Sequence, residues 1–243
     1  MYDKYFAPGH YLDYPIFLSI DHLVVIMIFF ILTVWLYIRR NKSYMGTNMR
    51  TGLLILLIVS EISLFVWTVS IGTWDIRYNL PFHLCTISLF FCIYMLLTNK
   101  KWVFEVVYFF GLAGALQAIL TPDLFYGFPH YRFLHFFIAH IGIILSILYM
   151  VWVEKYRVTM RSVVKSFVVL NGLAAVVYLI NILTGANYMF LAYKPEGASL
   201  LDFLGPHPWY ILQLELIALA MFTLLYLPFH FTRKSNEKKQ GAG

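Results

Sequence analysis

Reactive side chains are scarce in this sequence, and the first to occur inside an apolar segment are His83 and Cys85. They lie in the stretch LPFHLCTISLFF, residues 80–91, where a proline stands at the entrance of an expected helix. A cysteine acts as a nucleophile when a neighbouring base or positive charge stabilises its thiolate. Histidine is the side chain that most often supplies this base. The pattern therefore indicates covalent catalysis as the chemistry to consider.

The base for Cys85 is expected to come from another helix. His83 and Cys85 are two residues apart, about 200° around one helix, so they cannot both face the same point. With a rise of ~1.5 Å per residue, Cys85 and His140 both lie roughly 8–10 Å from the outer boundary of their apolar segments. His140 is therefore the expected general base, with Glu215 or Gln213 orienting its ring.

The other polar side chains in apolar segments are expected to line a cavity that opens to the outer side. Such groups are costly in hydrocarbon and usually face a bundle interior or a wet cavity. Most fall in the outer half of their segments, while Glu61 falls near the midplane. The candidate substrate-binding residues are Gln117, Asn181, Gln213, Glu215 and Glu61.

Each of these residues also has a purely structural interpretation. Cys85, Ser88 and Cys92 share one face of a helix, and small residues in such a row are typical of close helix packing. A histidine such as His140 is commonly a core residue that is hydrogen-bonded to a neighbouring carbonyl. The polar groups together could be unrelated hydrogen bonds between helices.

Composition places these residues in a membrane protein. The chain has 243 residues, of which 61% are hydrophobic and 12% are charged, whereas soluble domains have roughly 25% charged residues. A soluble domain of this size could not bury so much apolar surface, but a helical bundle in lipid exposes it to hydrocarbon. The sequence predicts an all-α fold, with a single integral membrane domain over residues 1–243 located in the cell membrane.

Seven apolar segments are predicted to cross the membrane, at about residues 21–38, 51–71, 80–97, 102–120, 133–153, 163–184 and 207–231. Each is close to the roughly 20 residues that a spanning helix needs. Of the 18 Lys and Arg residues, 14 fall on one side of these segments and 4 on the other. Because basic residues gather on the cytoplasmic side, the N-terminus is predicted outside and the C-terminus inside. Topology thus explains the net charge of +6, and no nucleic-acid partner is expected.

Several other chemistries are not expected. His22, His83, His135, His140 and His207 lie on the outer side, where three histidines with Glu215 could hold zinc. However, His135 and His140 are five residues apart, about 140° around a helix, and do not form the metal-binding i, i+4 pair. No glycine-rich phosphate loop, G-x-S-x-G elbow or C-x-x-C occurs. We expect no metal, no cofactor and, because Cys85 and Cys92 are about 10 Å apart along a helix, no disulfide between them.

Three stretches carry a resemblance to a known family: LPFHLC, HYRFLHFFIAH and FLGPHPWYILQLE. They resemble YwaF-type bacterial integral membrane proteins, relatives of the eukaryotic transmembrane protein 164 family, over nearly the whole chain. The resemblance implies a multi-pass protein of the bacterial cytoplasmic membrane that transfers acyl groups on phospholipids through a cysteine and a histidine. In the eukaryotic pattern the cysteine directly precedes the histidine that matches His83, where this chain has Phe82. Either Cys85 then takes over the role of the nucleophile or this branch of the family lacks it, and the later histidine is His135 or His140.

The predicted function is that of a lipid-modifying enzyme, which transfers or hydrolyses an acyl chain of a (lyso)phospholipid at the outer leaflet. Its expected partner is membrane lipid, and the oligomeric state stays open. A transporter or small-molecule binder, with Glu61 carrying a coupled proton, is the first alternative. The absence of Gly/Pro-broken helices and of an internal repeat favours the enzyme. A seven-span sensor is the second alternative, and only topology supports it.

Overall fold

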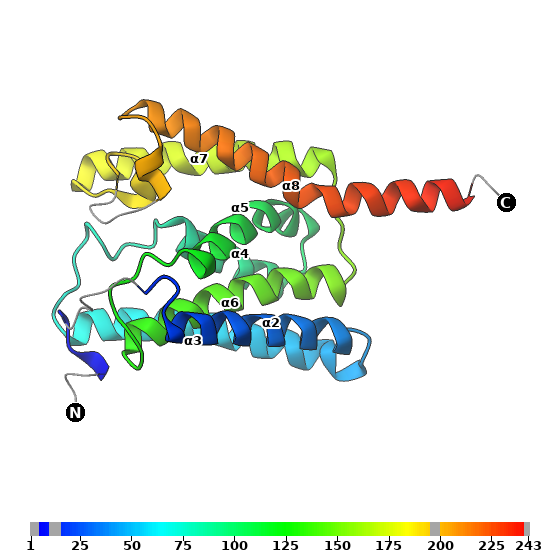
Figure 1. The fold of residues 1–243 in the computed structure, drawn as a ribbon, viewed down its shortest axis with the longest axis horizontal. Coiled ribbons are helices and arrows are strands. Elements are labelled where there is room, and N and C mark those ends of the chain that lie inside the picture. The colour runs from blue at the N-terminus through cyan, green and yellow to red at the C-terminus, as the bar shows by residue number, and fades with distance from the viewer. Residues whose placement is uncertain (1–4, 10–15, 195–199, 241–243) are drawn as a thin grey trace.

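The computed structural model describes residues 5–9, 16–194 and 200–240, and every regular element in this part of the chain is helical. The main helices are α2 (Ile20–Arg39), α3 (Thr47–Ser70), α4 (Leu84–Thr98), α5 (Lys101–Leu120), α6 (Tyr131–Trp152), α7 (Met160–Thr184) and α8 (Trp209–Gln240). Short 3-10 turns connect them: η1 (Ser43–Met45), η2 (Tyr188–Phe190) and η3 (Leu200–Phe203). In Figure 1 the helices run side by side, with α7 and α8 above, α2 and α3 below, and α4, α5 and α6 between them.

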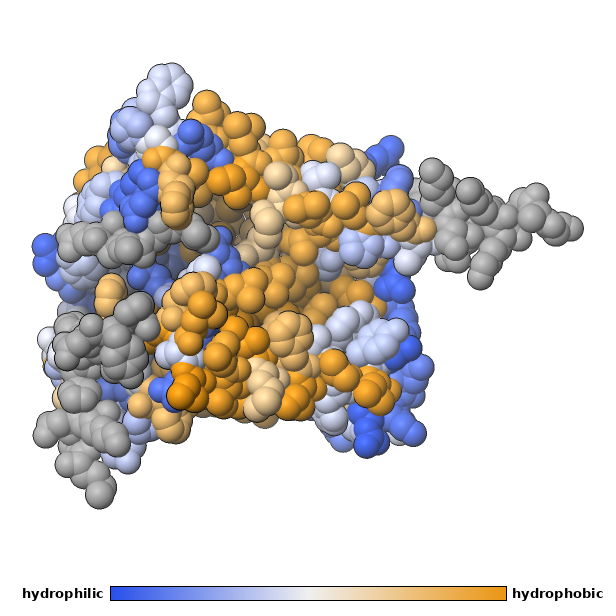
Figure 2. Space-filling view, viewed as in Figure 1, coloured by the Kyte–Doolittle hydropathy of each residue, from blue (hydrophilic) through white to orange (hydrophobic). Residues whose placement is uncertain are grey.

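Most of these helices have the length and apolarity of membrane spans. Among the described residues, six qualify: α2, α3, α5, α6, α7 and α8. The remaining helix, α4, has 15 residues, about 22 Å of length, against a hydrocarbon layer of roughly 30 Å. Figure 2 shows a hydrophobic band across the middle of the visible face and hydrophilic residues at both ends. The chain is therefore a multi-pass membrane protein, and the all-α prediction is confirmed.

The helix boundaries depart from the predicted spans by four residues or more at three places, the first being α3, which begins at Thr47 and not at residue 51. The helix expected from residue 80 begins at Leu84, with His83 as an extended N-cap residue. Leu80 precedes Pro81 and is therefore biased away from helical geometry, and Phe82 N–H closes a tight turn onto the Leu80 carbonyl at 2.8 Å. The last helix, expected over residues 207–231, runs on to residue 240 and extends beyond the bundle in Figure 1.

Small residues set the close approach of the central helices. A Cβ atom on Gly111 of α5 would lie only 3.0 Å from Cδ1 of Ile147 on α6 and 3.7 Å from Cβ of Ser88 on α4. Ser88 and Cys92 are both buried, and the Cys92 Sγ lies 4.0 Å from the Ile143 carbonyl oxygen of α6. Ser88 and Cys92, on the face of α4 that also carries Cys85, therefore pack against the neighbouring helices.

Tyr188 joins the loop before α4 to the segment after α7. Its side chain is fully buried. Its hydroxyl donates to the Ile76 carbonyl at 2.7 Å and accepts from the Leu80 N–H at 2.8 Å. Asn181 of α7 holds the Tyr188 backbone, with Nδ2 donating to the carbonyl at 3.0 Å and Oδ1 accepting from the N–H at 2.9 Å. This network fixes the turn from which α4 starts.

Replacing Tyr188 by phenylalanine should destabilise the fold by about 2 kcal/mol, because the Ile76 carbonyl and the Leu80 N–H each lose a buried partner. Unfolding of the purified protein in detergent, followed by circular dichroism, measures the change. The matched control is Tyr178→Phe on the exposed face of α7, which should leave the transition unchanged. Equal stability of both variants would contradict the role given to the Tyr188 hydroxyl.

Candidate functional site

A cavity of about 1580 Å³ lies between the helices and is lined by residues of α3 through α8 and of the loops before α4 and α6. It exceeds the roughly 300–1000 Å³ of typical small-ligand pockets. The face in Figure 2 is hollowed between its upper and lower halves. The predicted site residues that line the cavity are His83, Cys85, His135, His140, Glu61, Gln117 and Glu215.

Cys85 lies in the first turn of α4. The first hydrogen bond of this helix runs from the Ile87 N–H to the His83 carbonyl at 3.0 Å, and His83 gives no side-chain cap. The N–H groups of Leu84, Cys85 and Thr86 therefore have no partner in the described part of the chain, and all three residues line the cavity. Free N–H groups and the helix dipole favour negative charge at a helix N-terminus. Helix N-termini are among the positions at which proteins can stabilise a cysteine thiolate.

The face of α4 that carries Cys85 is turned towards α6. Cys92, seven residues later, shares this face and lies against the Ile143 carbonyl. α4 and α6 run in the same direction, because α5 returns the chain between them. Counting back seven residues on each helix places Cys85 level with Phe136. His140 then lies about 6 Å deeper, one helical turn below Cys85, although the sequence had placed both at one depth.

His140 has the tautomer that a general base needs. Its Nδ1 lies 2.6 Å from the Phe136 carbonyl oxygen, and since a carbonyl can only accept, Nδ1 carries the proton. The lone pair of the neutral ring is then on Nε2. The ring is 7% exposed and lines the cavity. His140 thus has the carbonyl bond of a core histidine and keeps a nitrogen that can accept a proton.

His135 is arranged differently, because a cation lies beside it. The Arg132 Nη1 donates to His135 Nδ1 at 3.5 Å, so the ring proton is on Nε2. Nε2 is buried and faces the Ser60 backbone without a hydrogen bond of good geometry. Both nitrogens are therefore poorly placed to take a proton, and of the two histidines His140 is the better base. Sequence reasoning overlooked Arg132, although it stands between the aromatic residues of HYRFLH.

Other predicted residues have partners that explain their positions. The His83 ring packs edge-on against Tyr188, with centroids 5.0 Å apart. Glu215 Oε2 accepts from Asn171 Nδ2 at 2.9 Å, and Gln213 Oε1 accepts from the Gly205 N–H at 2.7 Å. The Phe136 carbonyl holds the His140 ring, which is the role that the sequence had given to Glu215 or Gln213.

Two predicted residues lie outside the lining of the cavity. Asn181 uses both amide atoms to hold the Tyr188 backbone, and Gln213 closes the turn before α8. His22 also has a structural position, since Nε2 donates to the Ile119 carbonyl at 2.7 Å and Nδ1 accepts from the Leu18 N–H at 3.1 Å. Within the described residues, no group of three or more His, Cys, Asp or Glu side chains is arranged to hold a metal ion.

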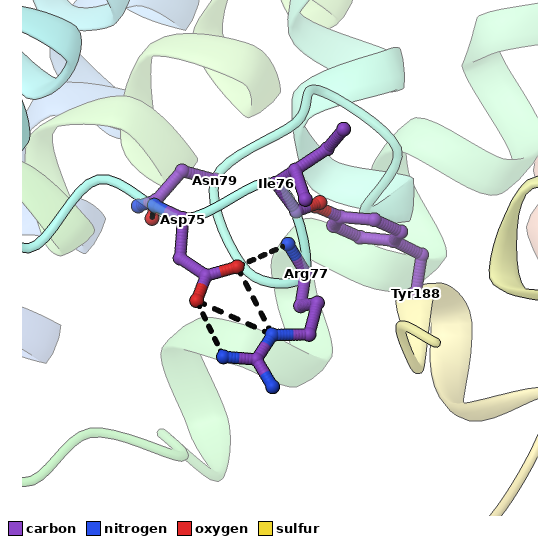
Figure 3. Close-up of polar contacts among 5 residues, drawn as sticks. All are labelled: Asp75, Ile76, Arg77, Asn79 and Tyr188. Atoms are coloured by element: carbon purple, nitrogen blue, oxygen red, sulfur yellow. Dashed lines mark hydrogen bonds and ion pairs between the residues drawn. The ribbon is translucent and has the colours of Figure 1, made fainter. Parts of the chain in front are cut away.

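The loop before α4 carries an ion pair outside the cavity lining (Figure 3). Arg77 donates to both carboxylate oxygens of Asp75, the shortest distance being 2.7 Å from Nη2 to Oδ2. The side-chain hydrogen bond from Arg77 lowers the pKa of Asp75 to about 2. The two charges neutralise each other beside the Tyr188 hydroxyl, which anchors the same loop through Ile76.

The fold and the cavity define a multi-pass helical membrane protein with a cysteine and histidines facing an internal cavity. A model of the TMEM164 family matches residues 14–226. The chain belongs to this family, and the resemblance seen in the three sequence stretches is confirmed. No curated protein and no solved structure matches the chain.

The two cysteines should differ in reactivity. Cys85 is half-buried and lines the cavity, whereas Cys92 is fully buried and absent from the lining. N-ethylmaleimide should therefore modify Cys85 at least ~10-fold faster, because thiol reactivity follows access and thiolate character. Intact-mass spectrometry of Cys92→Ala and Cys85→Ala in detergent gives the two rates separately. Equal rates would show that the first turn of α4 is not accessible from the cavity.

Proposed function

We propose that this protein transfers or hydrolyses an acyl chain of a (lyso)phospholipid at the outer leaflet, with Cys85 as nucleophile and His140 as general base. The observation that carries this proposal is the place of Cys85 in the first turn of α4, beside three unpartnered N–H groups. The same cavity contains the His140 ring, whose Nδ1 is held by a carbonyl so that Nε2 is free to accept a proton.

In the first half of the reaction, His140 Nε2 takes the thiol proton while the Cys85 sulfur attacks the ester carbonyl carbon of the lipid. The carbonyl oxygen becomes negatively charged, and the N–H groups of Cys85 and Thr86 are the available donors to it. The ester C–O bond then breaks. The leaving alkoxide takes the proton from His140, and a lysolipid departs from an acyl-thioester on Cys85.

In the second half, a hydroxyl group of water or of an acceptor lysolipid gives its proton to His140 and attacks the thioester carbonyl. The C–S bond breaks, and the Cys85 thiolate recovers the proton from the imidazolium. Water as acceptor gives hydrolysis, and a lysolipid gives acyl transfer. Because His140 lies about 6 Å deeper than Cys85, one water molecule between them can relay the proton in each half.

The apolar end of the cavity suits an acyl chain. Its lining includes Leu170 and Ala174 of α7 and Met221 and Phe222 of α8. Phe222 lies 13 residues from the start of α8, about 20 Å along the helix. An aliphatic chain that enters at the level of Cys85 thus meets apolar side chains along its length, and burying each methylene contributes about 0.8 kcal/mol.

We also propose that α4 is the seventh span, with the N-terminus outside and the C-terminus in the cytoplasm. Arg50, near the start of α3, donates to the carbonyls of Leu96 and Leu97 at the end of α4, at 2.5 and 3.1 Å. α4 therefore ends on the side of the bundle where α3 began, which supports a crossing by α4. The 14 basic residues on that side support its cytoplasmic location.

The acyl-enzyme is the test of the proposed chemistry. Protein in nanodiscs with a radiolabelled phospholipid should carry an acyl-thioester on Cys85, detected as an added acyl mass that hydroxylamine removes. Cys85→Ala should lose both the adduct and turnover, while His140→Gln should lower turnover about 10²–10⁴-fold, the usual contribution of a general base. Cys92→Ala and His207→Gln, which lie outside the cavity lining, should keep full activity. Undiminished turnover of Cys85→Ala would exclude this mechanism.

Cysteine accessibility in cells tests the orientation. In a Cys85→Ser, Cys92→Ala background, a new cysteine at exposed Tyr193 should react with a membrane-impermeant maleimide on intact cells. A cysteine at exposed Lys42, in the turn between α2 and α3, should react only after the membrane is opened. Labelling of both positions in intact cells, or the reverse order, would contradict the proposed seven-span topology.

A further inference from the structure

Arg132 is the cationic side chain that lines the cavity. It lies in the first turn of α6, and its guanidinium packs over the Trp67 ring at 5.8 Å from the centroid. Its hydrogen bond to His135 Nδ1 is long, at 3.5 Å. The Arg132 charge adds to the electrostatic environment of His83, His135 and His140. Arg132 therefore lies among the polar side chains of the cavity and carries the positive charge there.

No carboxylate of the described residues forms an ion pair with this guanidinium. Within the described chain, the ion pairs closer than 4.0 Å are Arg77 with Asp75, drawn in Figure 3, and Lys165 with Glu105. Three carboxylates line the same cavity as Arg132, those of Glu61, Asp123 and Glu215, yet none lies within 4.0 Å of its guanidinium. Its neighbours are instead an imidazole and an indole ring.

A guanidinium in such surroundings has a strong tendency to bind an anion. Removing a charge from water is costly unless a partner and hydrogen bonds compensate it. One long bond to an imidazole satisfies few of the five N–H donors of arginine. The guanidinium fork matches the oxygens of phosphate and of carboxylate in pairs, so an oxyanion is the ligand that these surroundings favour.

We propose that Arg132 binds the phosphate of a phospholipid headgroup inside the cavity. The choice of phosphate and of a phospholipid rests on the proposed function, whereas the need for an oxyanion rests on the guanidinium that has no carboxylate partner among the described residues. Cys85 lies level with Phe136, so Arg132 is four residues, about 6 Å, closer to the outer surface than the sulfur. In a glycerophospholipid the phosphorus and the carbonyl carbon of the neighbouring acyl ester are also roughly 6 Å apart at ordinary bond lengths.

The relative depths of Arg132 and Cys85 determine how the whole lipid would lie along the cavity. The phosphate lies at Arg132, the ester carbonyl lies at the free N–H groups of Cys85 and Thr86, and the chain continues towards Leu170 and Phe222. Arg132 is in this role a binding residue that selects lipids with a phosphate and sets the depth of the ester. It takes no proton in the reaction.

Lipid binding without turnover tests the proposal. In the Cys85→Ala background, native mass spectrometry with equal amounts of dioleoyl phosphatidic acid and dioleoylglycerol compares lipids that differ only in the phosphate group. The phospholipid should be retained at least ~10-fold better. Adding Arg132→Gln should reduce phospholipid retention about 10–100-fold, the range for a hydrogen bond to a charged group, and leave dioleoylglycerol unchanged.

Control variants separate charge recognition from folding. Arg77→Gln removes an arginine that Asp75 already neutralises outside the cavity, and it should leave lipid preference unchanged. Arg132→Lys keeps the charge without the fork and should retain a weakened preference, so the test survives if Arg132→Gln fails to fold. Inorganic phosphate at millimolar concentration should not displace the phospholipid, because the chains also bind. Displacement would assign the site to free phosphate.

Other outcomes overturn the proposal. An Arg132→Gln variant that keeps the preference for the phospholipid would show that Arg132 does not bind the phosphate. Equal loss of both lipids in this variant would show the same. Because turnover plays no part in the measurement, Arg132-dependent phospholipid binding without any acyl-enzyme on Cys85 would refute the proposed chemistry and leave the binding site standing. An acyl-enzyme on Cys85 together with phospholipid binding that does not depend on Arg132 would refute the binding site alone.

Discussion

The site depends on where α4 starts, and that start depends on the buried Tyr188 hydroxyl. This hydroxyl bonds the Ile76 carbonyl and the Leu80 N–H, so the chain is still extended at His83 and becomes helical only at Leu84. If the helix began at Leu80, Cys85 would lie in the second turn and its N–H would be bonded within the helix. Asn181, by holding the Tyr188 backbone, belongs to the same support.

Helix termini solve a problem that membrane enzymes share. Charged side chains placed deep in hydrocarbon are expensive, whereas the first turn of a helix offers free N–H groups and a partial positive charge without any ionised residue. Under the proposed mechanism this device supplies electrostatic stabilisation at Cys85, and the His140 ring, held by the Phe136 carbonyl, supplies a neutral base. Arg132 lies nearer the N-terminal end of α6, where, under the same proposal, a polar headgroup neutralises it.

Much of this arrangement was visible in the sequence because it depends on hydropathy. The apolar segments predicted the helices, six of them long enough to span, and depth counting brought Cys85 and His140 into one region. The sequence could not show that Tyr188 delays α4, because that contact joins residues more than 100 positions apart. The sequence also could not distinguish Asn181, whose side chain bonds the Tyr188 backbone, from an amide that binds a ligand. Arg132 was assigned only to the outer basic residues, since its missing carboxylate is a property of the folded cavity.

Under the proposed function, the order in depth of Arg132, Cys85 and His140 limits which lipid bond can react. These residues come from two parallel helices that are packed in one register, so the steps of about 6 Å between their depths do not adjust independently. A phosphate held at Arg132 leaves the ester next to it at the depth of Cys85, while a bond farther along the chain would pass below the free N–H groups. Packing that fixes α4 against α6, such as Cys92 against Ile143, thereby fixes the bond that the sulfur can reach. Under the proposed function, selection of the substrate and its orientation for attack therefore follow from one helix register.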